Sequence, residues 1–408
     1  MVKTVTHAKH SAFMSLIVKC TIICIALENV KILSLAGAAI KPIHFVFGLA
    51  VVYCVVAKRV PIKHLALGAF FLVLPVFPVY RINDLGEWIK TYAIYAIICL
   101  FMTFAMRHFI EEFKRNSKKY VIMIVNTIAF LEVLGIIQFI AMNLFGIFLF
   151  QDFWGMFQFH HSQFGMSGNL YRAYSLFYEP SVFAWVINTS ITICLFADNS
   201  ILSKRIKMLS IVTSVAAILC TLTTTGIAIT MVIFGVYLLT KSRNPVKIIT
   251  SLVGAGLLVI LIASFTDLLA PISRIFIEIQ TPNTSGYERL VTPLLYVGET
   301  FKHFPLFGRG LGQEGEVDAV GIIGRYASIH NSIFGIIAWF GLSALCFYIP
   351  ALIFCKKKIK ENRRWVLLIT MIIGIYISNG AFCSLDLYMF LVLIVAVGST
   401  ISCAQTEK

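Results

Sequence analysis

Charged side chains are scarce in this chain, and acidic ones are scarcer than basic ones. Only 13% of the 408 residues are Asp, Glu, Lys or Arg, whereas 59% are hydrophobic, and the mean hydropathy is +0.88. A single soluble core cannot bury so much apolar surface. The composition therefore excludes a soluble globular protein and indicates an all-α polytopic membrane protein.

Motifs that mark common catalytic centres are also missing. The sequence has no Asp-x-Asp pair of the kind that holds the metal of a nucleotide-sugar transferase, no GxxxxGK[ST] loop for ATP and no HExxH pair for zinc. Nine of the ten cysteines fall in or beside apolar runs, and only Cys383 lies in a short loop. We therefore expect no disulfide framework, no metal and no cofactor.

Long apolar runs are abundant instead. A helix needs roughly 16 to 22 mostly apolar residues to cross about 30 Å of hydrocarbon, and twelve such runs predict about twelve transmembrane helices within one integral membrane domain, residues 1–408. The seventh and eighth runs are separated at the polar break from Thr221 to Gly226, because one continuous helix would overshoot the bilayer. The predicted spans are 12–27, 43–57, 64–80, 88–106, 120–142, 181–197, 207–223, 226–240, 247–264, 332–354, 365–379 and 386–402.

Lysines and arginines gather in alternate loops. Because short loops rich in Lys and Arg stay in the cytoplasm, this pattern places both termini inside, with about 23 basic residues on the cytoplasmic side, about 10 on the outer side and Lys19 within the first span. The net charge of +15 is explained by this asymmetry. A nucleic-acid partner is not expected.

Two outer loops are much longer than the others, and loops of this kind often carry function. The first, residues 151–180, ends in RAYSLFYEPSVFA, which begins at Arg172. Pro180 suits a first helical turn, where free N–H groups and the helix dipole favour an anion, and Arg172 adds a planar fork that matches phosphate oxygens. Alternatively, Arg172 forms an ion pair with Glu179 that only fixes the loop. Glu179 is expected to support Arg172 or to orient a sugar hydroxyl.

The second long loop, residues 265–331, has internal order. TDLLAPISRIFIEI, residues 266–279, has the spacing of an amphipathic helix, and YERLVTPLLYVGETFKHF, residues 287–304, predicts a second helical stretch. The segment FGRGLG, residues 307–312, predicts a glycine-rich turn whose backbone can approach a ligand closely. The loop is thus expected to form a small cap over the bundle.

This cap contains the remaining candidates for a polar site. Arg289, Arg309 and Arg325 are candidate substrate-binding cations, although a surface salt bridge for Arg289 and solvated positions for the other two remain alternatives. His330 stands beside Asn331 at the threshold of a span, where a neutral imidazole is suited to act as a general base or to hydrogen-bond a substrate hydroxyl.

At these residues the chain resembles the O-antigen polymerase and O-antigen ligase superfamily of bacterial envelope proteins. RAYSLFYEPSVFA is similar to the pattern of an Arg, a short aromatic link and Glu-Pro-Ser opening a helix. FKHFPLFGRGLG followed by SIHNSIFGIIAWFGL is similar to the later pattern of a Pro-x-x-Gly-x-Gly turn and a His-Asn pair before a span. The segment YERLVTPL departs from the pattern, because no Trp soon follows Arg289.

The resemblance implies a metal-independent glycosyltransferase with a bundle like that of the membrane-embedded C type, at the periplasmic face of the bacterial inner membrane. Its donor would be an undecaprenyl-pyrophosphate-linked glycan, and membrane lipids and a chain-length regulator protein are further candidate partners. By this likeness Arg172 and Arg289 grip the pyrophosphate and His330 acts on the acceptor hydroxyl. The further candidate substrate-binding residues are Glu179, Asn331, Arg309 and Arg325. Arg309 is the alternative to Arg289 as the second arginine that binds the pyrophosphate.

Three functions fit these features. The Glu-Pro-Ser form at Glu179 looks more like Wzy-type polymerases, which elongate a lipid-linked repeat unit, than like ligases, which move the finished chain to lipid A–core. A lipid-linked oligosaccharide flippase is the alternative outside the enzymes. Transporters usually place binding groups at mid-membrane, where this chain has only Lys19 and Glu132 as clearly ionisable residues.

Overall fold

The computed structural model describes most of the chain but not all of it. The described residues are 2–35, 38–57, 60–82, 84–149, 166–167, 170–241, 280–281, 284–313, 331–378 and 383–404. The predicted span 247–264, the predicted amphipathic helix 266–279, Arg325 and His330 lie outside them.

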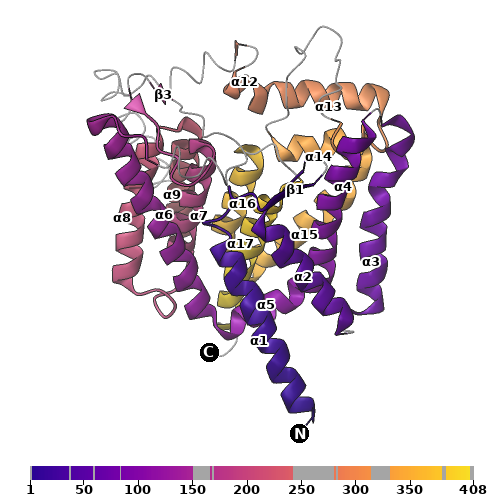
Figure 1. Ribbon diagram of the computed structural model, residues 1–408, viewed down its shortest axis with the longest axis horizontal. Helices are drawn as coiled ribbons and strands as arrows, with labels where there is room; N and C mark the ends of the chain where they lie inside the picture. Colours follow the sequence, from indigo (N-terminus) through magenta and orange to yellow (C-terminus); the bar gives the residue numbers. More distant parts are fainter. Residues whose placement is uncertain are drawn as a thin grey trace.

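The described chain is a bundle of helices that run between two ends (Figure 1). The chain termini are at the lower end in this view, and the short helices α12 (Ser285–Leu290) and α13 (Thr292–His303) lie across the upper end. The bundle helices are α1 (Val2–Ile23), α2 (Pro42–Val56), α3 (Ile62–Val73), α4 (Leu85–Leu100), α5 (Met106–Arg115), α6 (Ser117–Phe145), α7 (Pro180–Phe196), α8 (Lys204–Thr221), α9 (Thr224–Lys241), α14 (Ser332–Phe340), α15 (Leu345–Glu361), α16 (Trp365–Ser378) and α17 (Leu385–Ala404).

Short non-α segments complete the described chain. A 3₁₀ segment η1 (Leu74–Arg81) continues α3, a π-helical turn η2 (Phe101–Ala105) joins α4 to α5, and a 3₁₀ turn η4 (Gly341–Ala344) joins α14 to α15. Two small antiparallel pairs occur, β1 (Leu33–Leu35) with β2 (Ala38–Ile40), and β3 (Met166–Ser167) with β4 (Leu170–Tyr171). These strands were not predicted from the sequence.

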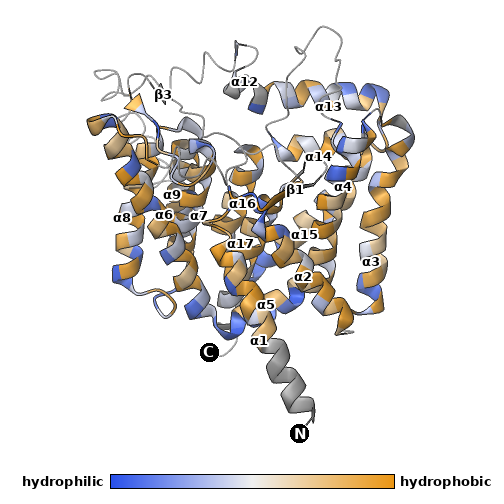
Figure 2. Cartoon of the chain, viewed as in Figure 1, coloured by the Kyte–Doolittle hydropathy of each residue, from blue (hydrophilic) through white to orange (hydrophobic). Residues whose placement is uncertain are grey.

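The all-α membrane architecture is confirmed, whereas the number of membrane crossings stays a prediction. Helices occur at eleven of the twelve predicted spans, and the other span lies outside the described residues. Within the described residues, five helical stretches are long and apolar enough to cross a membrane, and five shorter apolar helices accompany them. Apolar residues dominate the flanks of the bundle and polar ones its two ends (Figure 2). The five long stretches are Ile62–Tyr80, Leu85–Arg115, Ser117–Phe145, Thr224–Lys241 and Ser332–Glu361.

Helix α7 is the centre of this architecture. Nearly all of its residues are buried, because its apolar and small side chains face α6, α8, α9, α16 and α17 on every side. Asn188 ties it to α9: its amide donates to the Gly226 carbonyl at 3.0 Å and its oxygen accepts from the Thr230 hydroxyl at 2.7 Å. A Cβ on Gly226 would approach Ala184 Cβ to 2.6 Å, so glycine is needed for this packing.

One predicted loop is helical. Residues 107–119 were expected to connect two spans, but α5 continues to Arg115 and α6 begins at Ser117. The buried residues of α5 include Met106, Phe109 and Phe113, which lie on one face and pack against the rest of the bundle. The many lysines and arginines of this segment concealed that spacing.

We expect Gly226→Ala to lower the free energy of unfolding by about 1–3 kcal/mol, because the added methyl overpacks the contact between α9 and α7. Thermal unfolding of the purified protein in detergent measures the change. Gly48→Ala on α2 is the matched control, since no atom lies within 4 Å of the Cβ it would add. Equal melting temperatures for the two variants would contradict this account of the packing.

Candidate functional site

The segment from Tyr171 to Tyr178 reaches the upper end of the bundle along α6, which holds it by its backbone. The Asn143 side chain accepts from Tyr171 N at 2.8 Å and donates to Tyr171 O at 3.0 Å. Gln138, which is fully buried, accepts from Tyr174 N at 2.9 Å and from Ser175 N at 2.8 Å. These contacts satisfy backbone groups that lie away from water.

Residues of the Tyr171–Tyr178 segment also cap the C-terminal end of α8. The last turn of a helix leaves carbonyl groups without partners inside the helix. The Cys220 carbonyl accepts from Ala173 N at 2.9 Å, and the Thr221 carbonyl accepts from Arg172 Nε at 3.2 Å. The guanidinium group thus sits at the negative end of the α8 dipole, where a cation is favoured.

The turn between α8 and α9, residues 221–225 with the sequence TLTTT, is here called the threonine corner. Leu222 adopts the left-handed conformation with φ of 47°, and the hydroxyls of Thr221 and Thr223 share a hydrogen bond of 2.8 Å. Arg289 Nη1 donates to the hydroxyl of Thr225 at 3.0 Å. Arg172 and Arg289 therefore converge on one corner from segments more than 100 residues apart.

Asn331 joins the same cluster. Its amide donates to the Arg289 carbonyl at 3.2 Å, and its oxygen accepts from Ile333 N at 3.1 Å and from Phe334 N at 3.4 Å. Asn331 is thus the N-cap of α14 and a positioning contact for Arg289. The neighbouring His330 lies outside the described residues.

Glu179 occupies the N-cap position of α7, and Pro180 follows in the first turn as the sequence predicts. Its carboxylate accepts from the Ser181 hydroxyl at 2.7 Å. Between the described residues Arg172 and Glu179 the structure gives no ion pair, and the alternative that the two fix each other stays a prediction.

Arg309 lies in the predicted glycine turn, but it faces α13. The turn is confirmed: Gly308, Gly310 and Gly312 all have positive φ. Arg309 N and Gly310 N donate to the end of α14, and the guanidinium lies 5.9 Å from the Tyr296 ring and 5.7 Å from the Phe304 ring. No contact among the described residues links Arg309 to the threonine corner.

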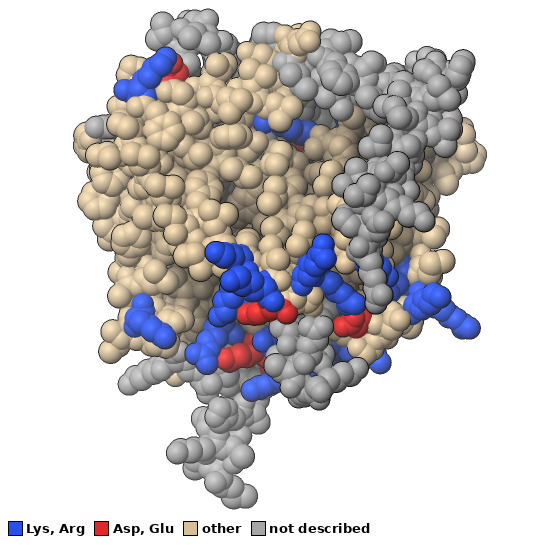
Figure 3. Space-filling model, turned by 180° about the vertical axis from the view of Figure 1, so that it is seen from behind, with Lys and Arg blue, Asp and Glu red and all other residues tan. Residues whose placement is uncertain are grey.

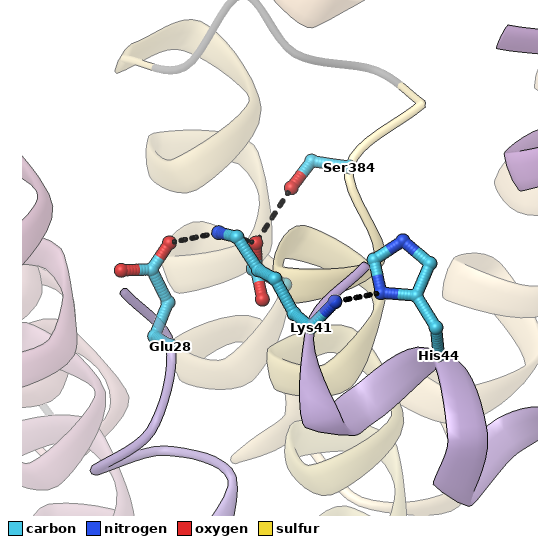
Figure 4. A network of polar contacts seen from close by, with 5 residues as sticks. Glu28, Lys41, His44 and Ser384 are labelled. Carbon is cyan, nitrogen blue, oxygen red and sulfur yellow. Dashed lines mark hydrogen bonds and ion pairs between the residues drawn. The ribbon is translucent and has the colours of Figure 1, made fainter. Parts of the chain in front are cut away.

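A second polar cluster, which the sequence did not predict, consists of Glu28, Lys41 and Asp386 and is here called the outer triad. Figure 4 labels its members Glu28 and Lys41. Lys41 Nζ lies 2.9 Å from Glu28 Oε1 and 2.6 Å from Asp386 Oδ2. The carboxylate side chains are only 3% and 9% exposed. Ser384 donates to Asp386 at 3.3 Å, and Lys41 N donates to His44 Nδ1 at 3.1 Å.

Burial and mutual attraction oppose each other in the outer triad. Burial raises the pKa of Glu28 to about 7, although the Lys41 ammonium works against this rise. Burial alone would lower the pKa of Lys41, but the two carboxylates outweigh it and raise that pKa. Burial also raises the pKa of Tyr178, and the Glu179 and triad carboxylates add to this rise. The triad therefore adjoins the start of α7.

The sequence carried a weak signal for the triad. Each member lies next to an apolar run, where an unpartnered charge is costly, but the three positions lie on three separate segments and form no local motif. In the part of the chain that the structure describes, no group of three His, Cys, Asp or Glu side chains is arranged to hold a metal.

These features define a multi-pass membrane protein in which two convergent arginines lie at one end of a helix bundle. Residues 14–399 match the model of the WcaD colanic acid polymerase family, and the chain belongs to that family. Membership confirms the resemblance to Wzy-type polymerases and implies a polysaccharide polymerase acting on a lipid-linked oligosaccharide. No curated protein matches the chain.

Gln138→Leu should weaken polysaccharide polymerisation, because two buried amides of the Tyr171–Tyr178 segment lose their acceptor, at a cost of about 1–3 kcal/mol. The measurement is the ladder of polysaccharide lengths in cells, normalised to protein in the membrane. Thr189→Val is the control, since in the described part of the chain that buried hydroxyl donates to Trp185 O, within α7 itself. A wild-type ladder from Gln138→Leu would show that the segment needs no anchor.

The stability of the protein should fall as pH rises from 5 to 8. With its pKa raised from 4.5 to about 7, folded Glu28 binds more protons than unfolded Glu28 within this window. Glu28→Gln removes the titrating group and should flatten the dependence of melting temperature on pH, measured in detergent. Glu299→Gln, at a half-buried α13 residue paired with Lys302, should keep the wild-type slope. An unchanged slope in Glu28→Gln would rule out the assigned titration.

Proposed function

We propose that this chain polymerises a surface polysaccharide by transferring an undecaprenyl-pyrophosphate-linked glycan onto the non-reducing end of another lipid-linked repeat unit. The reaction takes place at the periplasmic face of the inner membrane and requires no metal. The observation that carries the proposal is the convergence of Arg172 and Arg289 on the threonine corner.

The donor pyrophosphate binds at this corner. Arg172 and Arg289 supply planar guanidinium groups that match phosphate oxygens. The N-termini of α7 and α9 begin at the same end of the bundle, and their dipoles favour negative charge. Charge that develops on the leaving pyrophosphate is thereby stabilised. Arg309 and Arg325 are assigned to the glycan that extends from this corner.

The acceptor hydroxyl is activated by His330, which precedes Asn331 in the chain. The oxygen of the acceptor hydroxyl attacks the anomeric carbon of the donor sugar, and the bond from that carbon to the pyrophosphate breaks. The hydroxyl proton passes to His330, and undecaprenyl pyrophosphate leaves. The Asn331 side-chain amide positions Arg289 by donating to the Arg289 backbone carbonyl. Glu179 orients a sugar hydroxyl at the start of α7.

The charge distribution supports the periplasmic orientation. Lysines and arginines gather at the lower end of the bundle, the end at which the termini lie (Figure 3). By the positive-inside rule this end is cytoplasmic. The threonine corner then faces the periplasm, with the loops 151–180 and 265–331 forming the cap. The bundle is of the glycosyltransferase C type.

Arg172→Lys and Arg289→Lys should each reduce polymer formation more than tenfold, because lysine keeps the charge but not the bidentate fork. Each variant is expressed in a strain that lacks its own polymerase, and the polysaccharide ladder is compared at equal protein levels. Lys302→Gln, an exposed α13 variant, is the matched control and should restore the full ladder. A full ladder from both arginine variants would refute the proposed cradle.

Two further outcomes separate the alternatives. Purified protein given lipid-linked repeat units in detergent should yield longer products, which a flippase cannot do. If a knockout instead keeps lipid-linked polymer but loses capped lipid A–core, the protein is a ligase. Glu132 does not favour transport, because it is fully buried and accepts from Ser214 at 2.5 Å within the bundle.

A further inference from the structure

A cavity of about 360 Å³ opens at the lower end of the bundle, opposite the threonine corner. The helices α7, α8, α9 and α16 and their connections enclose it. None of the residues in the candidate site or the outer triad lines it. The cavity is therefore separate from the proposed reaction.

The cavity has an apolar floor and a cationic rim. Leu195, Met208, Ile211, Tyr237 and Leu367 contribute to the floor. The rim carries four basic side chains against a single carboxylate, so its net charge is three positive units. The charged lining residues are Lys204, Lys207, Lys241, Arg364 and Asp198.

The rim charges are only partly compensated. Asp198 pairs with Arg364, and Lys207 donates to the Ala197 carbonyl and to Asn199 Oδ1, the latter at 3.0 Å. Within the described chain, neither Lys204 nor Lys241 is paired with a carboxylate. Lys241 Nζ lies 4.7 Å from the centre of the Tyr237 ring, a contact that leaves the net positive charge of the rim uncancelled.

The first turn of α8 adds to the excess of positive charge. Lys204 opens this helix, whose first turn contains no acidic residue. A helix N-terminus is itself positive and favours Asp, Glu or an anion over lysine. The N-cap Ser203 hydroxyl accepts from Ile206 N but carries no charge, so Lys204 and the helix dipole both add positive potential to the rim.

We propose that this cavity binds the phosphate headgroup of an anionic phospholipid. The phosphate lies at the rim with Lys204 and Lys241, and the start of the acyl chains covers Met208 and Ile211. Basic pockets between membrane helices are suited to such headgroups. A free phosphate ion matches the rim but leaves the apolar floor uncovered, so the site is assigned to a lipid.

The test measures thermal unfolding of the full-length protein in detergent during titration with phosphatidylglycerol. The lipid should raise the melting temperature of the wild-type protein. In Lys204→Gln/Lys241→Gln the half-saturating lipid concentration should rise about 25-fold, from about fivefold for each lysine. Lys204→Arg/Lys241→Arg, which keeps both charges, should bind within about threefold of wild type. This test needs no polymerase activity, so its outcome is independent of the proposed reaction.

Three control arms decide the source and the place of binding. Lys118→Gln/Lys119→Gln removes two exposed lysines from the start of α6 and should leave binding unchanged. Phosphatidylcholine and inorganic phosphate should each give little stabilisation. An equal loss in the α6 variant, an equal shift with phosphatidylcholine, or saturation by inorganic phosphate at the same concentration would overturn the proposal.

Discussion

The turn at the threonine corner is the constraint on which the rest of the upper end depends. Helices α8 and α9 together run from Lys204 to Lys241, and a straight helix of that length would be nearly twice the thickness of a bilayer core of about 30 Å. The chain must therefore turn at the membrane surface, where the final carbonyls of α8 need donors. Ala173 and Arg172 supply them. The contacts that satisfy the end of α8 therefore also position Arg172 of the candidate substrate site.

The central position of α7 fixes where this site can form. Because its whole surface is packed, α7 holds α6, α8 and α9 at set distances, and the close contact at Gly226 sets the start of α9. Gln138 then places the Tyr171–Tyr178 segment against the end of α8. Arg172 is thus oriented by backbone contacts on both sides of the segment.

The amino-acid sequence predicts the helices well, because the length and apolar composition of each run are enough to indicate a buried or membrane-spanning helix. It places the break between α8 and α9, the proline start of α7 and the glycine turn at Gly308 from local chemistry alone. It misses the helical character of α5, whose apolar face is hidden among lysines. Composition alone could not separate a charged loop from a charged amphipathic helix.

The candidate site was predicted in part for the same reason. Arg172, Glu179 and Asn331 stand beside helix starts that can be read locally, so they could be found. The convergence of Arg172 with Arg289 depends on tertiary packing around the threonine corner, which one sequence does not contain. The outer triad was missed because its members are far apart in the chain. The aromatic neighbours of Arg309 could not be predicted, because they lie in and beside another helix, α13.

The outer triad has a consequence for biosynthesis. Glu28 and Lys41 emerge from the ribosome near the beginning of translation, whereas Asp386 arrives more than 340 residues later. Until α17 inserts, the ammonium of Lys41 has one carboxylate instead of two, and the outer ends of α1 and α2 have no contact with that helix's first turn. The last helix to be inserted thus completes the charge balance of the first two, which makes closure of the bundle sensitive to whether the whole polypeptide has been made.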